Sequence, residues 1–319
     1  MMKINNKNIA VLCGGDENNQ ERAVSLRSGA AVCDALIEAG FNAKIIDLKN
    51  LDELESETLT GFDKAFIAMH GEWGEGGELQ AKLDAMGVPY TGSEPKSSAL
   101  AMDKWASREL FKQAGIKIPK GLLLSAKVID LNFSAEDFNL IRAELGADLV
   151  VKPRAGGSTV GTTIINNASL ESFNKAVRLA YESYLGDVLI EEYIAGRELT
   201  VGVWEVDNKA QALPVIEIKP KAGYYDYENK YTVGATEYIV PAELDDDTAL
   251  KVAEAAVKAH EVLGCKDYSR ADFRLANDNQ AYILEVNTAP GMTATSLVPK
   301  AARAVGVSMS EFVNAILNI

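Results

Sequence analysis

Two carboxylates, an amide and a guanidinium near the end of the sequence are spaced so that they can share one face of a β-hairpin. Residues 269–275 and 282–287 are strand-like and flank the polar turn at 277–279, which predicts two antiparallel strands. Successive side chains of a strand point to opposite faces. One face then gathers Arg270, Asp272, Glu285 and Asn287, and the other gathers Ala271, Phe273, Leu275, Tyr282, Leu284 and Val286.

The polar face of this hairpin could hold a metal ion together with a phosphate. Two carboxylates that lie close together repel each other unless a cation sits between them. Carboxylate and amide oxygens suit Mg²⁺, which shares its ligand shell with water and substrate phosphates. The alternative is that these polar residues are the solvated side of an ordinary antiparallel hairpin, and the hairpin alone does not decide between the two.

A glycine-rich segment could supply contacts to such a phosphate. The sequence predicts a buried strand at 148–153, a loop at 154–161 and a second strand at 162–165. A loop between two strands does not match the Walker A pattern, which leads into a helix. It can fold over phosphates as a flap that donates backbone N–H groups, with Lys152 as a nearby point charge. A tight hairpin turn built from glycines is the alternative.

Four other segments carry polar side chains where a ligand could use them. Residues 188–198 predict a strand, a turn and an acidic strand, which could offer backbone groups to an adenine and a carboxylate to a ribose. The tyrosine-rich residues 224–231 read as a functional loop or lid. Glu21 opens the first predicted helix, where the macrodipole favours a carboxylate, and His70 ends a parallel strand, where ligands of open α/β sheets bind. A plain strand–turn–strand, a packed surface loop and a simple helix terminus are the structural alternatives.

The elements that must position these residues begin with a parallel β–α–β unit. Strands are predicted at 8–13, 42–48 and 64–69, and a helix at 21–39 connects the first two. Gly14-Gly15 lacks the dinucleotide-binding fingerprint. Farther along, helices are predicted at 77–86, 97–114, 169–184, 245–263 and 309–317, and strands at 188–206, 210–219 and 237–240.

Composition narrows the class of partner. The chain has 319 residues and a net charge of −14, which argues against nucleic acid or an anionic membrane as a partner because both need a basic surface. The cysteines Cys13, Cys33 and Cys265 show no paired spacing, and two histidines cannot complete a zinc set. Free thiols and the lack of a signal peptide or apolar span lead us to expect a cytoplasmic protein.

In this order the motifs resemble one family, the D-alanine–D-alanine ligases of the ATP-grasp superfamily. The resemblance runs along nearly the whole chain, and the segments 225–231 and 285–293 are its most specific parts. It is carried by Gly14-Gly15, by Met69-His70-Gly71, by Met102-Asp103-Lys104 and by the segments 21–26, 89–93, 152–153 and 157–161.

The resemblance implies an α/β fold with α+β subdomains, in which an ATP-grasp fold follows an N-terminal parallel βαβ domain. The expected domains are 1–93 for substrate, 94–190 with the flap, and 191–319 with the metal hairpin and lid. ATP would lie between the last two. The implied contacts are Lys104, Lys152 and Lys230 for phosphates, Glu191 and Ile194 for adenine, Glu198 for the ribose, and Asp272, Glu285 and Asn287 for two Mg²⁺ ions, which Mn²⁺ could replace.

For the two D-alanine molecules the resemblance implies a second set of contacts. Glu21 would take the ammonium of the first D-alanine, linked by hydrogen bonds to Ser158 and Tyr231. Arg270 and the backbone at Gly291 would hold the reacting carboxyl and the tetrahedral intermediate. His70, Ser296 and Leu297 are the remaining substrate-binding positions, the last two beside the second D-alanine.

The implied activity is the ADP-forming ligation of two D-alanines through D-alanyl phosphate, for peptidoglycan, by a homodimer. A ligase that joins D-alanine to D-lactate is a close rival, and Tyr231 favours the dipeptide. A catalytically silent nucleotide-binding regulator is the rival of another class. Several places depart from the family pattern. The segment Asp16–Gln20 before Glu21 is longer than usual, and Thr159 stands where a second serine is frequent. Arg154-Ala155-Gly156 is an unusual start to the flap, and Arg274 stands where an apolar residue often packs on adenine.

Overall fold

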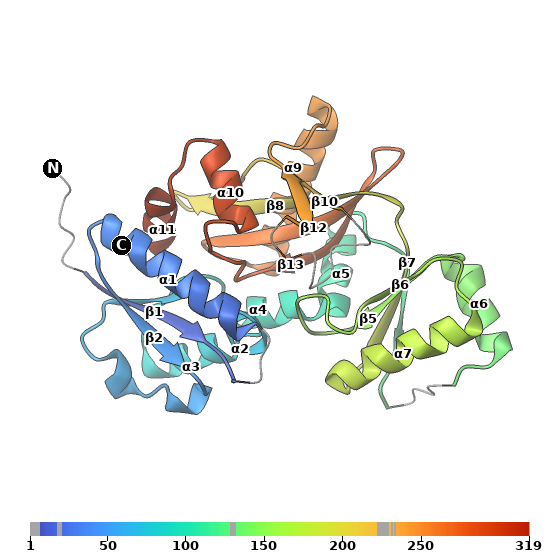
Figure 1. Cartoon of the computed structure of the whole chain (residues 1–319), viewed down its shortest axis with the longest axis horizontal. Helices are drawn as coiled ribbons and strands as arrows, with labels where there is room; N and C mark the ends of the chain where they lie inside the picture. The colour runs from blue at the N-terminus through green and yellow to red at the C-terminus, as the bar shows by residue number, and fades with distance from the viewer. Residues whose placement is uncertain are drawn as a thin grey trace.

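Three β-sheets, each with its own helices, make up the part of the chain that the computed structural model describes (Figure 1). The described residues are 7–17, 21–127, 132–221, 230, 232 and 234–318. None of the helices within these residues combines the length and apolar content needed to cross a membrane.

The first sheet is a small parallel one. Its middle strand β1 (Asn8–Gly14) is buried from Ile9 onward, because β2 (Asn42–Leu48) and β3 (Lys64–Ile67) pair with it on both sides. This confirms the predicted parallel β–α–β unit. The helices that follow its strands are α1 (Arg22–Glu38), α2 (Glu72–Glu75) and α3 (Glu78–Met86), with short 3-10 turns at Leu51–Glu53 and Ser56–Leu59.

The second sheet is antiparallel, in the order β4-β7-β5-β6. Its helices bury one face in an apolar core that includes Phe138, Phe173 and Leu149. The glycine loop joins two neighbouring strands, β5 and β6, as the sequence predicts. The bounds are β4 (Gly121–Leu124), α6 (Ala135–Leu145), β5 (Leu149–Pro153), β6 (Thr163–Ile165), α7 (Leu170–Tyr184) and β7 (Val188–Glu192).

The third sheet, in the order β11-β10-β8-β12-β13 with β9 paired to β8, places β12 in its interior. Helix α9 covers one face in a core that contains Val252 and Phe273, whereas Tyr268 belongs to a core shared with the N-terminal sheet. The bounds are β8 (Gly196–Val206), β9 (Lys209–Ala212), β10 (Ile216–Pro220), β11 (Thr236–Ile239), α9 (Asp246–Leu263), β12 (Tyr268–Ala276), β13 (Ala281–Asn287), α10 (Leu297–Ala304) and α11 (Met309–Leu317).

The single helix predicted at 97–114 is wrong, because two helices occupy this stretch: α4 (Pro95–Met102) and α5 (Lys104–Gln113). Asp103 between them has an extended backbone, with φ −79° and ψ 94°. Its carboxylate accepts hydrogen bonds from the backbone N–H groups of Trp105 and Ala106 at 3.1 and 3.0 Å. Asp103 therefore caps α5 and puts Lys104 in the first position of the new helix.

The apolar side chains of α4 and α5 pack on the third sheet, while Arg108 of α5 pairs with Glu191 of β7 in the second. Ala101 of α4 and Phe111 of α5 lie in the same core as Leu199, Val252 and Phe273. The flap, in contrast, grows out of the second sheet. Lys104 and the flap thus belong to two separately packed bodies that face each other.

The predicted β12–β13 hairpin is confirmed in its pairing, but one part of the predicted alternation is wrong. Asp272 lies opposite Glu285, whereas Phe273 lies opposite Ile283, so a β-bulge at Leu284 shifts the register. The extra residue turns Ile283 into the core, where it is 1% exposed. Leu284, which the sequence assigns to the core face, instead lines a cavity.

Candidate active site

Two adjoining cavities lie between the three bodies. One has a volume of about 420 Å³ and the other about 140 Å³. Both are lined by Lys104, Gly156, Gly157, Lys230 and Glu285, so a ligand in one would meet a ligand in the other at these residues.

The structure brings almost all of the predicted site residues to these two cavities. Tyr231 lies outside the described residues. The larger cavity is lined by Glu21, His70, Ser158, Arg270, Asn287, Gly291, Ser296 and Leu297, and the smaller by Lys152, Glu191, Ile194, Glu198 and Asp272, in addition to the shared Lys104, Lys230 and Glu285.

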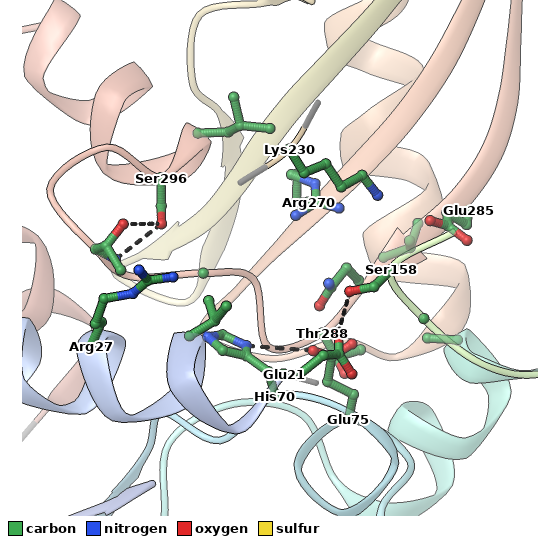
Figure 2. Close-up of a pocket in the computed structure, with 18 of the residues that line it drawn as sticks. Glu21, Arg27, His70, Glu75, Ser158, Lys230, Arg270, Glu285, Thr288 and Ser296 are labelled. Atoms are coloured by element: carbon green, nitrogen blue, oxygen red, sulfur yellow. Dashed lines mark hydrogen bonds and ion pairs between the residues drawn. The ribbon is translucent and has the colours of Figure 1, made fainter. Parts of the chain in front are cut away.

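Glu21 and Ser158 meet across the larger cavity (Figure 2). Glu21 occupies the position just before α1, and the Ser158 hydroxyl donates a hydrogen bond to its carboxylate. The backbone at Ser158 has φ 50°, a left-handed conformation that a non-glycine residue rarely adopts and that is typical of functional positions. Burial, followed by repulsion from Glu75, raises the pKa of Glu21. A buried carboxylate with this environment is suited to receive a cationic group.

His70 and Glu75 form the floor of the same cavity. The Nδ1 atom of His70 lies 3.0 Å from the carbonyl oxygen of Ala289, which can only accept, so Nδ1 carries the proton in the neutral ring. Its Nε2 then accepts from the hydroxyl of Ser28 at 2.9 Å. Glu75 Oε1 is 3.5 Å from Nδ1. The imidazole is thus fixed on both sides and holds the 287–291 loop against the N-terminal sheet.

Ser296 lies at the opposite end of the larger cavity from Glu285 (Figure 2), and Gly291 approaches it closely. A Cβ atom at Gly291 would come within 2.9 Å of the Ser296 hydroxyl, so glycine permits this close approach. Ser296 precedes α10 without capping it, and its hydroxyl accepts from the N–H group of Thr293 at 3.0 Å. The first turn of α10 therefore faces this end of the cavity with its positive dipole end.

The smaller cavity contains a buried ion triad. Lys152 Nζ lies 2.6 Å from one carboxylate oxygen of Glu191, and Arg108 Nη1 lies 3.0 Å from the other. Arg108 also donates to the carbonyl of Pro119 at 2.6 Å. Two cations share one carboxylate, so the charge of Glu191 is fully compensated and Lys152 stays beside the cavity. The side chain of Glu191 is committed to these partners, so only the backbone of the linker is open to an adenine edge.

Arg274, another departure from the family pattern, also lines the smaller cavity. It donates to the carbonyls of Ile194 and Gly196 at 3.0 and 2.8 Å and lies over the ring of Tyr193. Its Nη1 is 3.6 Å from Glu198. The guanidinium thus fixes the linker between the second and third sheets and does not point into solvent.

Glu198 gives a pH-dependent prediction. Burial raises its pKa to about 7, only partly offset by Arg274, so the folded state holds a proton that the unfolded state releases near pH 4.5. Stability therefore falls as pH rises between these values. We expect Glu198→Gln without nucleotide to unfold with a free energy about 2 kcal/mol higher than wild type at pH 8, and with little difference at pH 4.5. Urea denaturation at both pH values tests this. The exposed Glu237→Gln is the control, and an equal gain at the two pH values would contradict the assignment.

The metal set predicted from the hairpin fits a divalent cation in its donor chemistry. Although burial opposes ionisation, Lys104, Lys230, Lys152 and Arg270 hold the pKa of Glu285 at about 2. Asp272 receives the guanidinium of Arg270 at 2.9 and 2.8 Å and the hydroxyl of Thr200 at 2.6 Å. Both carboxylates are therefore already surrounded by positive or donor groups.

The protein itself supplies few ligands for such a cation. Within the described residues, no group of three or more His, Cys, Asp or Glu side chains could hold a metal. Two carboxylates and the Asn287 amide oxygen would need ligands from elsewhere, and Mg²⁺ commonly takes them from nucleotide phosphates and water. The residues present thus fit a metal that arrives with a nucleotide better than one held permanently.

Glu75 and Arg27 are cavity residues that the sequence reasoning missed. Arg27 extends from α1 toward the end of the cavity marked by Ser296 (Figure 2). Val24, Arg27 and Ala31 line the cavity from one face of α1, and this helical spacing was the available signal. For Glu75 the signal was only its position shortly after His70, at the end of a parallel strand.

Comparisons with known proteins agree with this geometry. Residues 110–318 match the family model described as the D-ala D-ala ligase C-terminus. The chain is 43% identical over 307 residues to the D-alanine–D-alanine ligase of Bordetella petrii, covering 95% of this chain and 89% of the relative. It is 40% identical over 311 residues to that of Desulforamulus reducens, covering 98% and 97%.

Solved structures give the same result. The D-alanine–D-alanine ligase from Bacillus anthracis complexed with ATP matches with a TM-score of 0.80 and 32% identity, covering 98% of this chain and 96% of that chain. The VanG D-Ala:D-Ser ligase from Enterococcus faecalis matches with a TM-score of 0.83 and 28% identity, covering 98% and 99%. With identity above 40% along nearly its whole length and an ATP-grasp architecture throughout, the chain belongs to the D-alanine–D-alanine ligase family.

Proposed function

We propose that this chain joins two molecules of D-alanine at the expense of ATP, with the nucleotide in the smaller cavity and the amino acids in the larger one. The observation that carries the proposal is the junction of the two cavities at Lys104, Lys230 and Glu285. A phosphoryl group bound there can pass from the nucleotide to a carboxylate in the larger cavity. The product, D-alanyl-D-alanine, serves peptidoglycan synthesis.

The reaction needs an activated carboxyl group because a carboxylate is a poor acyl donor. A carboxylate oxygen of the first D-alanine attacks the γ-phosphorus, the bond to the β-phosphate oxygen breaks, and ADP leaves with that electron pair. The amine of the second D-alanine then attacks the acyl carbon. The tetrahedral intermediate expels inorganic phosphate, and the amine proton is released.

The cations of the site allow two anions to approach each other. Lys104 from α5, Lys152 from β5 and Lys230 line the smaller cavity and would contact the phosphates, while Arg270 lines the larger cavity and would hold the reacting carboxyl. Fixed positive groups aimed at the charge that develops in the transition state are usually the largest catalytic term. Asp272, Glu285 and Asn287 would hold the magnesium ions, whose charge neutralises the phosphate oxygens when the nucleotide is bound.

Glu21 orients the first D-alanine. Its carboxylate lies in the larger cavity and can bind the ammonium of the substrate, while Ser158 fixes the orientation of that carboxylate. The flap that carries Ser158 also covers the smaller cavity through Gly156, Gly157 and Thr159. Covering the junction excludes water, to which an acyl phosphate would otherwise be lost. Tyr231, the third member expected at this point, lies outside the described residues.

Ser296 and Leu297 would receive the second D-alanine. The start of α10 offers the positive end of its dipole to a carboxylate, at the end of the cavity away from Glu285. The amine of an acceptor held there points back toward the acyl phosphate. Holding both substrates in line in this way can reduce the barrier by about 7–11 kcal/mol in favourable cases.

Release of phosphate from ATP tests the function. With Mg²⁺ present, we expect phosphate release to require D-alanine and to yield one D-alanyl-D-alanine per phosphate. D-lactate and D-serine offered as competing acceptors separate the dipeptide activity from ester formation and from the D-serine activity that the VanG relative's name describes. Binding of ATP without D-alanine-dependent release would instead indicate a silent nucleotide-binding protein.

Location and assembly complete the proposal. The free and buried Cys13, Cys33 and Cys265 suit a reducing cytoplasm. A homodimer is supported by exposed apolar side chains on the N-terminal body, with Ile37 of α1 55% exposed and Ile45 of the edge strand β2 40% exposed. A symmetric partner could cover these side chains.

A further inference from the structure

The unusual start of the flap contains an arginine that joins two packed bodies. Arg154 Nε and Nη2 donate to the two carboxylate oxygens of Asp103 at 2.9 and 2.6 Å, and Nη1 donates to Asp187 at 2.8 Å. Arg154 and Asp187 belong to the second sheet, at the ends of its neighbouring strands β5 and β7. Asp103 caps α5, which packs on the third sheet. The bidentate pair therefore crosses the boundary between the two halves of the nucleotide cleft.

Next to the Arg154–Asp103 contact, hydrogen bonds also fix Lys104 against the flap. The backbone N–H of Lys104 donates to the carbonyl of Arg154 at 2.9 Å. The ammonium of Lys104 donates to the carbonyl of Gly156 at 2.6 Å and lies 3.1 Å from Glu285. Gly156 is pressed on the ring of Tyr184, because a Cβ there would lie 2.3 Å from it. The start of the flap is thus held at Asp103, at Asp187 and on α7.

The pair is built for orientation more than for stability. The side chains of Arg154 and Asp103 are 35% and 28% exposed, and ion pairs with this much solvent contribute little to folding, about 0–1 kcal/mol. A bidentate guanidinium–carboxylate contact nevertheless fixes the angle between its two partners. Although burial opposes it, Arg154 lowers the pKa of Asp103, which favours the charged form of the contact.

We propose that Arg154 is a positioning residue for the phosphate site. Its bidentate contact with Asp103, called the clasp below, ties the start of the flap to the cap of α5. Lys104 and Ser158 therefore keep fixed positions relative to each other around the nucleotide. The inference rests on the proposed function for its role in catalysis, but its effect on nucleotide binding does not. Without the clasp, the start of the flap keeps its hydrogen bonds to the N–H and ammonium groups of Lys104, and α5 keeps the Arg108–Glu191 pair deeper in the cleft, but no bidentate contact fixes the angle between the flap and α5. Lys104 then loses its fixed direction relative to the flap.

The test compares two arginines that make the same kind of contact. Arg197 binds Glu217 through Nε and Nη2 at 2.9 and 2.6 Å and is also 35% exposed, but its pair stays within the third sheet. We expect Arg154→Gln to weaken binding of a non-hydrolysable ATP analogue with Mg²⁺ and to lower kcat/KM for ATP, each by roughly 10- to 100-fold. Arg197→Gln should change both by less than about threefold. Its Tm should fall further than that of Arg154→Gln, because the carboxylate of Glu217 is only 8% exposed and is left without this partner, so destabilisation alone would not account for weaker binding.

Two further variants separate positioning from a general structural effect. Asp103→Asn keeps a good helix cap but loses the charged bidentate contact, so it should reproduce most of the Arg154→Gln loss. The double variant should then be no worse than Arg154→Gln alone, because both changes remove one interaction. Arg154→Lys keeps the charge without the fork and should restore binding only in part.

Calorimetric binding of the analogue and steady-state kinetics on the same preparations give the outcomes. Three results would each contradict the positioning role of Arg154. They are wild-type affinity of Arg154→Gln for the analogue, losses in Arg197→Gln equal to those in Arg154→Gln, and losses that add up when Arg154→Gln is combined with Asp103→Asn. A wild-type chain that binds the analogue but makes no dipeptide would overturn the proposed function instead, and the binding series would still decide the role of Arg154.

Discussion

Glu285→Gln is expected to lower kcat by roughly 10³-fold while the chain remains folded. The substitution keeps the shape of the side chain but removes the charge around which Lys104, Lys230, Lys152 and Arg270 are gathered. Asp272 would remain as the one charged oxygen ligand opposite it on the hairpin. Phosphoryl transfer would then proceed with less charge neutralisation at the junction of the cavities, where it is needed most. Single-turnover measurement of phosphate release separates this loss from slow product release.

The matched control for Glu285→Gln is Glu94→Gln. Glu94 also pairs with a lysine, Lys266, but on the surface. Its replacement should leave kcat unchanged and cost about 0–1 kcal/mol of folding stability. Circular dichroism should show that both variants are folded, with a lower Tm for Glu285→Gln, because folding favours the charged form of Glu285. Turnover of Glu285→Gln within tenfold of wild type would remove Glu285 from the phosphate and metal site.

The hairpin shows how far sequence reasoning reached at the site. Side-chain parity predicts that Arg270, Asp272, Glu285 and Asn287 share one face, and in the structure Asp272 lies opposite Glu285 and Arg270 opposite Asn287. It fails for Leu284, since an inserted residue leaves no mark in the apolar run at 282–284. The position of a bulge depends on packing with β8 and α9, which a single strand sequence does not contain.

The contacts of Arg154 could not be predicted from the sequence, for a different reason. The sequence shows that the start of the flap is unusual, but the partners Asp103 and Asp187 are 51 and 33 residues away. The break at Asp103 is a local signal, because an aspartate followed by helix formers is a favoured cap. A continuous apolar periodicity outweighed it in the prediction of one helix at 97–114. The N-terminal parallel β–α–β unit, by contrast, follows from strand and helix alternation, which depends on local pattern alone, whereas the ATP-grasp part of the fold class came from the family resemblance.

Glu21→Gln is expected to reduce kcat/KM for the first D-alanine by roughly 10²- to 10³-fold and to leave the chain as stable as wild type or more stable. Burial and the nearby Glu75 raise the pKa of Glu21, so its negative charge is unfavourable in the folded protein without substrate. The ionised carboxylate lowers the stability of the fold. This loss begins as pH rises above the pKa of Glu21 in the unfolded state, about 4.5, and increases until pH passes the higher pKa of the folded state. A neutral, isosteric amide avoids this penalty but cannot bind an ammonium group as strongly.

Opposite changes in activity and stability are the signature that distinguishes a substrate-binding carboxylate from a structural one. A helix-terminal glutamate kept only for the dipole of α1 would lose stability on replacement and leave the D-alanine KM unchanged. Glu17, exposed and paired with Lys49, provides the control, since Glu17→Gln should change neither quantity. Urea denaturation at pH 8 and D-alanine kinetics at saturating ATP measure the two effects. A Glu21→Gln chain that is less stable at pH 8 and keeps its D-alanine KM would show that the contact with Ser158 is structural, and that the first D-alanine binds elsewhere in the cavity.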